Sequence, residues 1–356
     1  MVLALLRAAI HQQKVETADF LQATEEDWVE CYLLAMRQGV SSLVWDSIQS
    51  LPAQHQPPLN VKLSSTLREK KQEERYRNHC LAATKITELL AQHGIATMIL
   101  KGVGLSRLYP VPAHREGGDI DIYTYSADKA KMSDEQAHRL ADELLLQQGA
   151  QSDGSDYKKH SKLGIHGVTI ENHRMFLHVA ECQTTDKAEQ WLQAHRNTQV
   201  ADLLDGECRI EVPSTAFDSV FIPLHAASHY GNGLALKHLC DWALLIKQEG
   251  YALPSDLDDK HFKLTVTTLT HLCNQYLGLS VPVEADCNIA NDMMSEILRP
   301  PYYGDEPTGG KAQQYLFLIL NRIHIFRLGH RLLGISFLGK IRGWLLRKIK
   351  KLFSLQ

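Results

Sequence analysis

The chain has no C-x-x-C pair, no long uncharged apolar run and no internal repeat. Its seven cysteines are odd in number and scattered, which excludes a disulfide framework and a zinc ribbon and indicates a reduced cytoplasm. No stretch of 18 uncharged apolar residues exists, so no membrane-spanning helix is expected. The apolar start is interrupted by Arg7 and no small-residue cleavage site follows it, so we interpret it as a helix rather than a signal peptide.

Acidic residues are missing from the C-terminal part. Residues 321–356 contain nine Lys or Arg and no Asp or Glu, whereas the rest of the chain carries 29 basic against 41 acidic residues. The net charge of −3 therefore hides a basic tail on an acidic body. Apolar residues recur at helical spacing in residues 331–356, which predicts a basic amphipathic helix. It could dock on the chain's own body, on an anionic membrane surface, or on a nucleic acid or protein partner.

Hydrophobic periodicity predicts the order of elements along the 356 residues. We expect helices over 1–60 with a proline-rich loop at 51–58, and then a long helix over 64–93. Strands are expected at 95–100 and 119–125, followed by a helix over 133–148 that Ser133 and Gln136 cap, and by a hairpin of 156–163 and 165–173 around Gly164. Helices are expected from 213 to about 320, with a break near Gly231-Asn232-Gly233. This order predicts an α+β fold with a small mixed sheet between helical regions. We divide the chain into an N-terminal helical region (1–80), a core (81–212), a C-terminal helical region (213–330) and the basic tail helix (331–356).

The strongest chemical signal is the run Gly118-Asp119-Ile120-Asp121-Ile122. Alternate side chains of a strand share a face, so the two aspartates point the same way while the isoleucines point into the core. Two adjacent carboxylates repel unless a cation lies between them, and Mg²⁺ prefers such oxygen ligands. The alternative is an acidic pair near a turn with one lysine partner.

The segment 168–173 offers a third carboxylate. Thr169, Glu171 and His173 share one face of this alternating strand, and Val168 and Ile170 share the other. Glu171 is therefore a candidate third ligand, and His173 is a candidate for contact with metal or substrate. The alternative for Glu171 is an exposed strand residue.

A glycine-containing turn, Lys101-Gly102-Val103-Gly104, directly follows the first strand. Glycines let backbone N–H groups approach a phosphate, and a lysine supplies a point charge suited to it. The spacing matches neither the P-loop nor the dinucleotide-binding fingerprint.

The run from Met98 to Tyr125 resembles the signature of the DNA polymerase β-like nucleotidyltransferase superfamily. More narrowly, it is similar to an uncharacterised bacterial nucleotidyltransferase family with the pattern L-K-G…Y-P…R…G-D-I-D. The matching residues are Leu100, Lys101, Gly102, Tyr109, Pro110, Arg115, Gly118, Asp119, Ile120 and Asp121. The later Ile170–His173 and the stretch Leu224-His225…His229…Asp241 resemble further parts of that family, over about residues 20 to 250. The Gly-Ser turn usual in the superfamily is Lys-Gly here.

The resemblance implies transfer of a nucleoside monophosphate from an NTP, with ATP as the first candidate, to an acceptor hydroxyl. Asp119, Asp121 and Glu171 would hold two Mg²⁺ ions, and Glu171 would also accept the acceptor's proton. Lys101 and Arg115 would offset phosphate charge, while Gly102, Gly104 and Gly118 would border the nucleotide and His173 would touch metal or substrate. The product would be an NMP-modified acceptor and pyrophosphate.

The acceptor stays open. The resemblance favours a sugar, glycolipid or surface-polysaccharide intermediate, and the alternatives are a protein hydroxyl, as in adenylylating toxin–antitoxin enzymes, or a small molecule such as an aminoglycoside. A nucleic-acid acceptor is not expected, because the acidic body would repel phosphate. The rival from another class is a non-catalytic nucleotide-binding scaffold. We expect a cytoplasmic protein whose tail is a candidate contact with the inner face of the membrane.

His225, His229 and Asp241 lie outside the run from Met98 to Tyr125. His225 and His229 share a helix face, but a zinc site needs a third ligand, so packing or the lining of an acceptor cleft is the favoured interpretation. Asp241 is predicted to be a structural partner of a basic group or a helix end.

Overall fold

The computed structural model describes residues 1–152, 154, 159–165, 167–178, 182–230, 233–299, 311–338 and 341. The α-helices are α1 (Val2–His11), α2 (Glu25–Arg37), α3 (Ser41–Gln49), α4 (Leu59–Ala91), α5 (Val103–Ser106), α6 (Asp134–Gln147), α7 (Gln183–Ala194), α8 (Thr215–Ser228), α9 (Leu236–Ile246), α10 (Lys260–Leu277), α11 (Cys287–Leu298) and α12 (Lys311–Leu333). Short 3-10 helices lie at Thr17–Phe20, Ala53–His55 and Pro112–His114, the last labelled η3. The predicted α+β class is confirmed.

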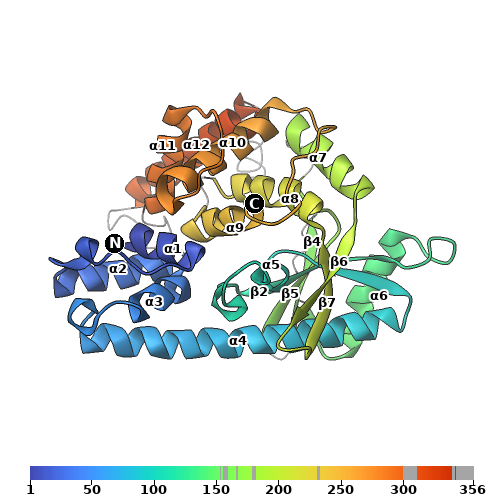
Figure 1. Ribbon diagram of the computed structural model, residues 1–356. Helices are drawn as coiled ribbons and strands as arrows, with labels where there is room; N and C mark the ends of the chain where they lie inside the picture. The colour runs from blue at the N-terminus through green and yellow to red at the C-terminus, as the bar shows by residue number, and fades with distance from the viewer. Residues whose placement is uncertain are drawn as a thin grey trace.

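The strands form one mixed sheet and one separate ribbon (Figure 1). The sheet has the order β1-β2-β5-β4-β3, with β1 (Ile95–Ile99), β2 (Asp119–Ser126), β5 (Val168–His173), β4 (His160–Ile165) and β3 (Gln151–Ser152). Only the central pair β2 and β5 is parallel; the other neighbours are antiparallel. The ribbon pairs β6 (Thr198–Leu203) with β7 (Cys208–Pro213).

The register of the parallel pair decides where the chemistry lies. Asp119 faces Thr169 and Asp121 faces Glu171 across β2 and β5, although about 50 residues separate the partners. Ile120 and Ile122 are buried, as are Val168 and Ile170. The alternation predicted for both strands is therefore confirmed, and it turns the polar face of both strands to one side.

The predicted cap of α6 is also confirmed. The Ser133 hydroxyl accepts the Gln136 amide, and the Gln136 side chain accepts the Ser133 amide in return. Such reciprocal bonds satisfy donors that a helix start leaves open. The long helix α4 starts at Leu59, directly after Pro58, rather than at residue 64. A proline is tolerated at the start of a helix but not inside one, because it has no backbone N–H to donate and its ring clashes with the preceding turn.

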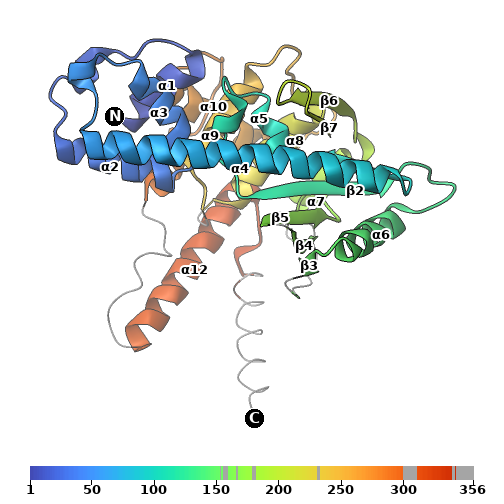
Figure 2. The same ribbon diagram turned by 90° about the horizontal axis from the view of Figure 1, so that it is seen from below.

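Two apolar cores lie along the length of α4, which runs beneath the whole molecule in Figure 1. One contains the sheet, the ribbon, α6 and the C-terminal half of α4. The other combines α1–α3 with α8–α11, so helices from both ends of the chain share it. Figure 2 shows the start of α12 projecting from this body, whereas Leu328, Leu332 and Leu333 near its end are buried in the second core.

The remaining sequence predictions have mixed outcomes. The β4–β5 hairpin turns at Gly167, which has a positive φ of 77°, and not at Gly164, which lies within β4. The ribbon β6–β7 and helix α7 were not predicted. The break between α8 and α9 is confirmed, although Gly231 and Asn232 themselves lie outside the described residues. The predicted start of the tail helix (331–356) is wrong, because residues 331–333 end α12 and residues 334–336, where Gly334 has a positive φ of 69°, are not helical; residues 339, 340 and 342–356 lie outside the described residues.

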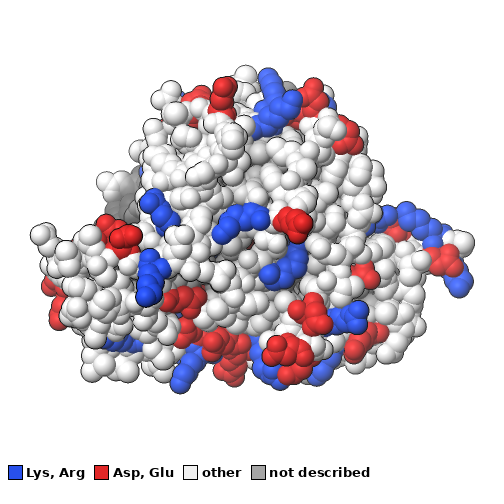
Figure 3. All heavy atoms as spheres, in the orientation of Figure 1, with Lys and Arg blue, Asp and Glu red and all other residues white. Residues whose placement is uncertain are grey.

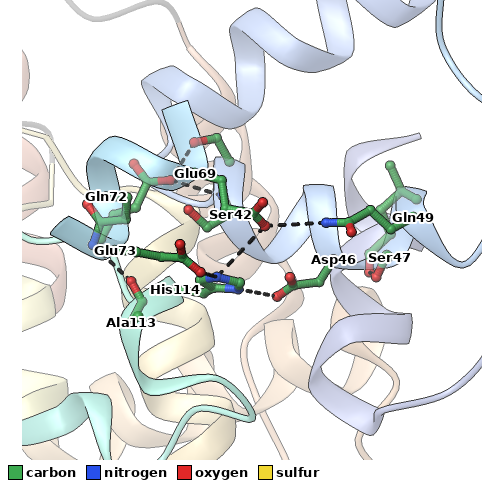
Figure 4. Close-up of polar contacts among 12 residues, drawn as sticks. Ser42, Asp46, Ser47, Gln49, Glu69, Gln72, Glu73, Ala113 and His114 are labelled. Carbon is green, nitrogen blue, oxygen red and sulfur yellow. Dashed lines mark hydrogen bonds and ion pairs between the residues drawn. The ribbon is translucent and has the colours of Figure 1, made fainter. Parts of the chain in front are cut away.

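The loop before β2 is fastened to the N-terminal helices through His114 (Figure 4). Its Nδ1 lies 2.8 Å from Asp46 of α3, and its Nε2 lies 3.4 Å from Glu73 and 3.8 Å from Glu69 of α4. His114 is 5% exposed. Burial acts against a charged ring, but the hydrogen bond and charge of Asp46, with Glu73 and Glu69, raise the pKa of His114.

The face seen in Figure 3 mixes acidic and basic side chains, and large areas between them are uncharged. Among the helices of the described residues, none is long and apolar enough to cross a membrane.

Candidate active site

Three carboxylates meet at the start of the parallel strands. Oxygen atoms of Asp119, Asp121 and Glu171 all lie within 4.8 Å of one another. Asp119 and Asp121 are brought together by the strand period, and Glu171 by the register of β5 on β2. The third carboxylate predicted from the sequence therefore lies beside the other two.

Asp121 is the most enclosed of the three and is held by two partners. Its Oδ1 lies 2.5 Å from Lys101 Nζ and 2.9 Å from His173 Nε2. Both Asp121 and His173 are 1% exposed. Burial alone would raise the pKa of Asp121, but the charge of Lys101 and the hydrogen bond from His173 hold it well below its ordinary value. Asp121 is therefore a fixed carboxylate anion.

The surroundings of the other oxygen of Asp121 show whether the site fits a cation. Asp121 Oδ2 is buried and has no hydrogen-bond partner among the described residues. A buried charged oxygen without a partner is costly, and native proteins seldom leave one so. Asp119 and Glu171 place two further hard oxygen donors around it, which is the donor set that Mg²⁺ takes. The residues present therefore fit a divalent cation.

His173 is placed as a partner of Asp121 rather than as an exposed ligand. Burial lowers the pKa of His173 to about 4, so the ring is neutral at pH 7 and its Nε2–H donates to Asp121. The ring thereby orients the carboxylate whose second oxygen is free of partners.

Glu171 differs from Asp121 in its electrostatic setting. Burial, then the charges of Asp121 and Asp119, raise the pKa of Glu171, while Lys101 and Lys162 oppose the shift. A carboxylate with a raised pKa is a better proton acceptor than an ordinary one. Two neighbouring carboxylates on one sheet face thus differ in the affinity of their oxygens for protons.

The two glycines of the turn after β1 have different surroundings. Gly102 lines the cavity and has φ of 63°, and a Cβ there would lie 3.3 Å from the Asp119 carbonyl oxygen. A Cβ on Gly104 would lie 2.6 Å from the Ile99 carbonyl oxygen. Gly104 thus permits close packing of α5 on the end of β1, and it does not line the cavity. Gly118 lines it with open space around its Cα.

Arg115 lies at the cavity but is paired. Its Nε and Nη2 each donate to Asp241 over 2.9 Å, and Tyr109 donates to the same carboxylate over 2.7 Å. The predicted structural role of Asp241 as the partner of a basic group is thereby confirmed. The network joins the loop before β2 to α9 across more than 120 residues of sequence.

Asp119 and Asp121 open into a cavity of about 180 Å³ between the sheet and α8–α9, and Glu171 does not line it. Lys101, Gly102, Arg115, Gly118, Asp119 and Asp121 line it from the core, and His225, His229, Lys237, His238 and Asp241 line it from the helices. The concave site is therefore built from both parts of the chain.

Comparison with known proteins identifies the family of this chain. A family described as "Uncharacterised nucleotidyltransferase" matches residues 24–278. The chain belongs to this family. No curated protein matches. A solved structure, an antigenic nucleotidyltransferase-like protein from Paracoccidioides brasiliensis, is 15% identical with a TM-score of 0.35, over 55% of this chain and 87% of that one.

Three residues at or near this candidate site were not predicted from the sequence. Lys159 is buried beside the carboxylates, and burial and the charge of Lys101 lower the pKa of its ammonium to about 8. Lys237 and His238 come from the start of α9 and line the cavity. Each is a single polar residue without a local pattern, so no signal in the sequence marked it.

Proposed function

We propose that this protein is a Mg²⁺-dependent nucleotidyltransferase that moves a nucleoside monophosphate from an NTP, ATP as first candidate, to an acceptor hydroxyl. The observation that carries the proposal is the partnerless buried Oδ2 of Asp121 next to Asp119 and Glu171. Membership in a nucleotidyltransferase family supports the reaction class.

Each residue has a defined part in the proposed reaction. Asp119, Asp121 and Glu171 would hold Mg²⁺, which when bound offsets phosphate charge and activates the acceptor hydroxyl. The acceptor oxygen attacks the α-phosphorus, the bond from that phosphorus to the bridging oxygen breaks, and pyrophosphate leaves. Glu171 takes the acceptor's proton. His173 keeps Asp121 oriented.

Cations around the cavity support binding of a triphosphate. Lys101 is tied to Asp121 and Arg115 to Asp241, so their charges are partly offset by these carboxylates. Lys237 lines the same cavity, and burial lowers the pKa of its ammonium. A phosphate group would give this partly desolvated ammonium the partner that favours its charged form.

The experiment is a transfer assay with α-phosphate-labelled NTPs, Mg²⁺ and a cell lysate later separated into glycan, protein and nucleic-acid fractions. Asp121→Asn keeps the size of the side chain and removes its charge. Asp205→Asn is the matched control, because Asp205 is an exposed turn residue with a positive φ that asparagine tolerates. We expect label in one fraction with the wild type and the control, and none with Asp121→Asn.

Label in the glycan fraction would identify the sugar or glycolipid acceptor that the family resemblance favours, and label in protein would identify the adenylylating alternative. Equal labelling with Asp121→Asn would refute the site. Nucleotide binding without any transfer would favour the scaffold alternative.

A further inference from the structure

Three histidines converge in the cavity, on the helical side. His225 lies in α8, His229 directly follows α8, and His238 lies in the first turn of α9. Their ring centroids lie 4.8 Å, 5.1 Å and 6.1 Å apart. One nitrogen from each ring lies within 4.8 Å of the other two. The third ligand that the spacing of His225 and His229 could not supply thus comes from the neighbouring helix.

We propose that His225, His229 and His238 bind a Zn²⁺ ion, separate from the carboxylate site. Imidazole nitrogens are ligands that zinc prefers and magnesium does not. Nitrogens bound tetrahedrally at about 2.0–2.1 Å lie about 3.3 Å apart, so they need to approach by at most about 1.5 Å. Side-chain rotation supplies such a movement.

His225 and His238 are in the protonation state that binds metal. Burial and neighbouring cationic groups lower the pKa of both His225 and His238 well below the ordinary value, so both are neutral at pH 7. The buried Nδ1 of His225 has no hydrogen-bond partner among the residues that the structure describes. A polar nitrogen left so inside a protein needs a partner, and a metal ion is one.

His238 is positioned by the backbone of α9. Its Nδ1 lies 3.2 Å from the Ala235 carbonyl oxygen, so an Nδ1–H donates there and leaves Nε2 to bind metal. The same Nδ1 lies 3.0 Å from the Ala235 amide nitrogen. If Nδ1 accepts that amide hydrogen, the ring carries its own hydrogen on Nε2, which then cannot bind metal. Metal binding selects the first arrangement.

The type of ligand, and not the surrounding charge, separates this site from the carboxylate site. Lys101, Lys159, Lys237 and Arg115 are the cations that act on these rings, and Lys101 and Arg115 carry a carboxylate partner each. These charges repel any divalent cation, so an ion here must be held by its bonds to the imidazole nitrogens, which zinc forms and magnesium does not. A three-histidine site also leaves a fourth position for water or an anionic substrate group.

The test uses the full chain, freed of metal with a chelator and titrated with Co²⁺, a spectroscopic substitute for Zn²⁺, in excess Mg²⁺. We expect the visible absorption of tetrahedral Co²⁺, which Zn²⁺ abolishes. His229→Gln and His225→Gln should each weaken binding by at least about 100-fold, since even loss of an indirect partner of a metal ligand costs 10- to 100-fold. His93→Gln, an exposed histidine at the end of α4, is the matched control.

Asp121→Asn should keep the Co²⁺ spectrum, and this result does not depend on whether the protein transfers nucleotides. Circular dichroism checks that each variant is folded; if His225→Gln is not, His229→Gln alone decides. A missing spectrum, binding unaffected by the folded histidine variants, or loss of the spectrum in Asp121→Asn would overturn the proposal.

Discussion

Asp241→Asn is predicted to be among the most destabilising conservative substitutions in this protein. Asp241 accepts three hydrogen bonds, two from Arg115 and one from Tyr109. The side chains of Arg115 and Asp241 are 7% and 5% exposed. Asparagine keeps the size of the side chain but removes its charge. The guanidinium of Arg115 then stays buried without a counter-charge.

The burial of Arg115 and Asp241 determines how much unfolding free energy Asp241→Asn should lose. Removing one partner of a buried ion pair costs about 3–5 kcal/mol, because water does not reach the charge that remains. Tyr109→Phe removes one hydrogen bond to a charged acceptor and should cost about 1.5–3 kcal/mol. The double variant Arg115→Gln/Asp241→Asn should be less destabilised than the sum of its single variants, since it leaves no uncompensated charge.

The assay is urea unfolding followed by tryptophan fluorescence and circular dichroism, with the midpoint and the slope fitted separately. The matched control is Glu207→Gln, which removes the charge of the ion pair of Arg77 and Glu207, whose side chains are 51% and 53% exposed. Exposed pairs contribute little, so the control should unfold almost as the wild type does. If Asp241→Asn unfolds at the same urea concentration as Glu207→Gln, the reasoning from burial is wrong.

Three further predictions concern single groups. Glu171→Gln should lower the transfer rate in Mg²⁺ by at least about 100-fold; in the metal-free protein the pKa of Glu171 lies above the ordinary 4.5, so Mg²⁺ binding should weaken as pH falls through that value, as metal titrations at several pH values would show. The pKa of His114 is raised in the folded protein, so His114 should stabilise the fold fully below its unfolded pKa of about 6.5 and lose this contribution as pH rises through the folded pKa. Between pH 6 and pH 9, His114→Gln should therefore lose less unfolding free energy than the wild type does. Gly104→Ala should cost about 1–3 kcal/mol in urea unfolding, because the new Cβ would lie 2.6 Å from the Ile99 carbonyl oxygen; an unchanged midpoint would contradict this.

Local patterns predicted the parts of the fold that local chemistry determines. The alternation around Asp119 and Asp121 predicted β2, and the spacing of Ser133 and Gln136 predicted the start of α6. The alternation around Glu171 likewise predicted β5 and the face that carries its carboxylate. These signals are local, since each depends on residues two or three positions apart.

Long-range packing explains what the sequence could not predict. Glu171 was predicted to lie near Asp119 and Asp121, but the parallel register that sets it opposite Asp121 joins distant strands, and no local pattern encodes it. His238 joins His225 and His229 only because α9 folds back on α8. The hairpin turn was misplaced by three residues because two glycines, Gly164 and Gly167, compete locally, and only Gly167 has a positive φ.

The most direct test of the central claim compares two labels of one NTP in parallel reactions with Mg²⁺ and the acceptor fraction. Nucleotidyl transfer at Asp119, Asp121 and Glu171 predicts that the α-phosphate label enters the acceptor and that the γ-phosphate label is recovered in pyrophosphate. Both signals should be absent in Asp121→Asn. Recovery of the γ-label in the acceptor would show phosphoryl transfer instead, and that result would contradict the account.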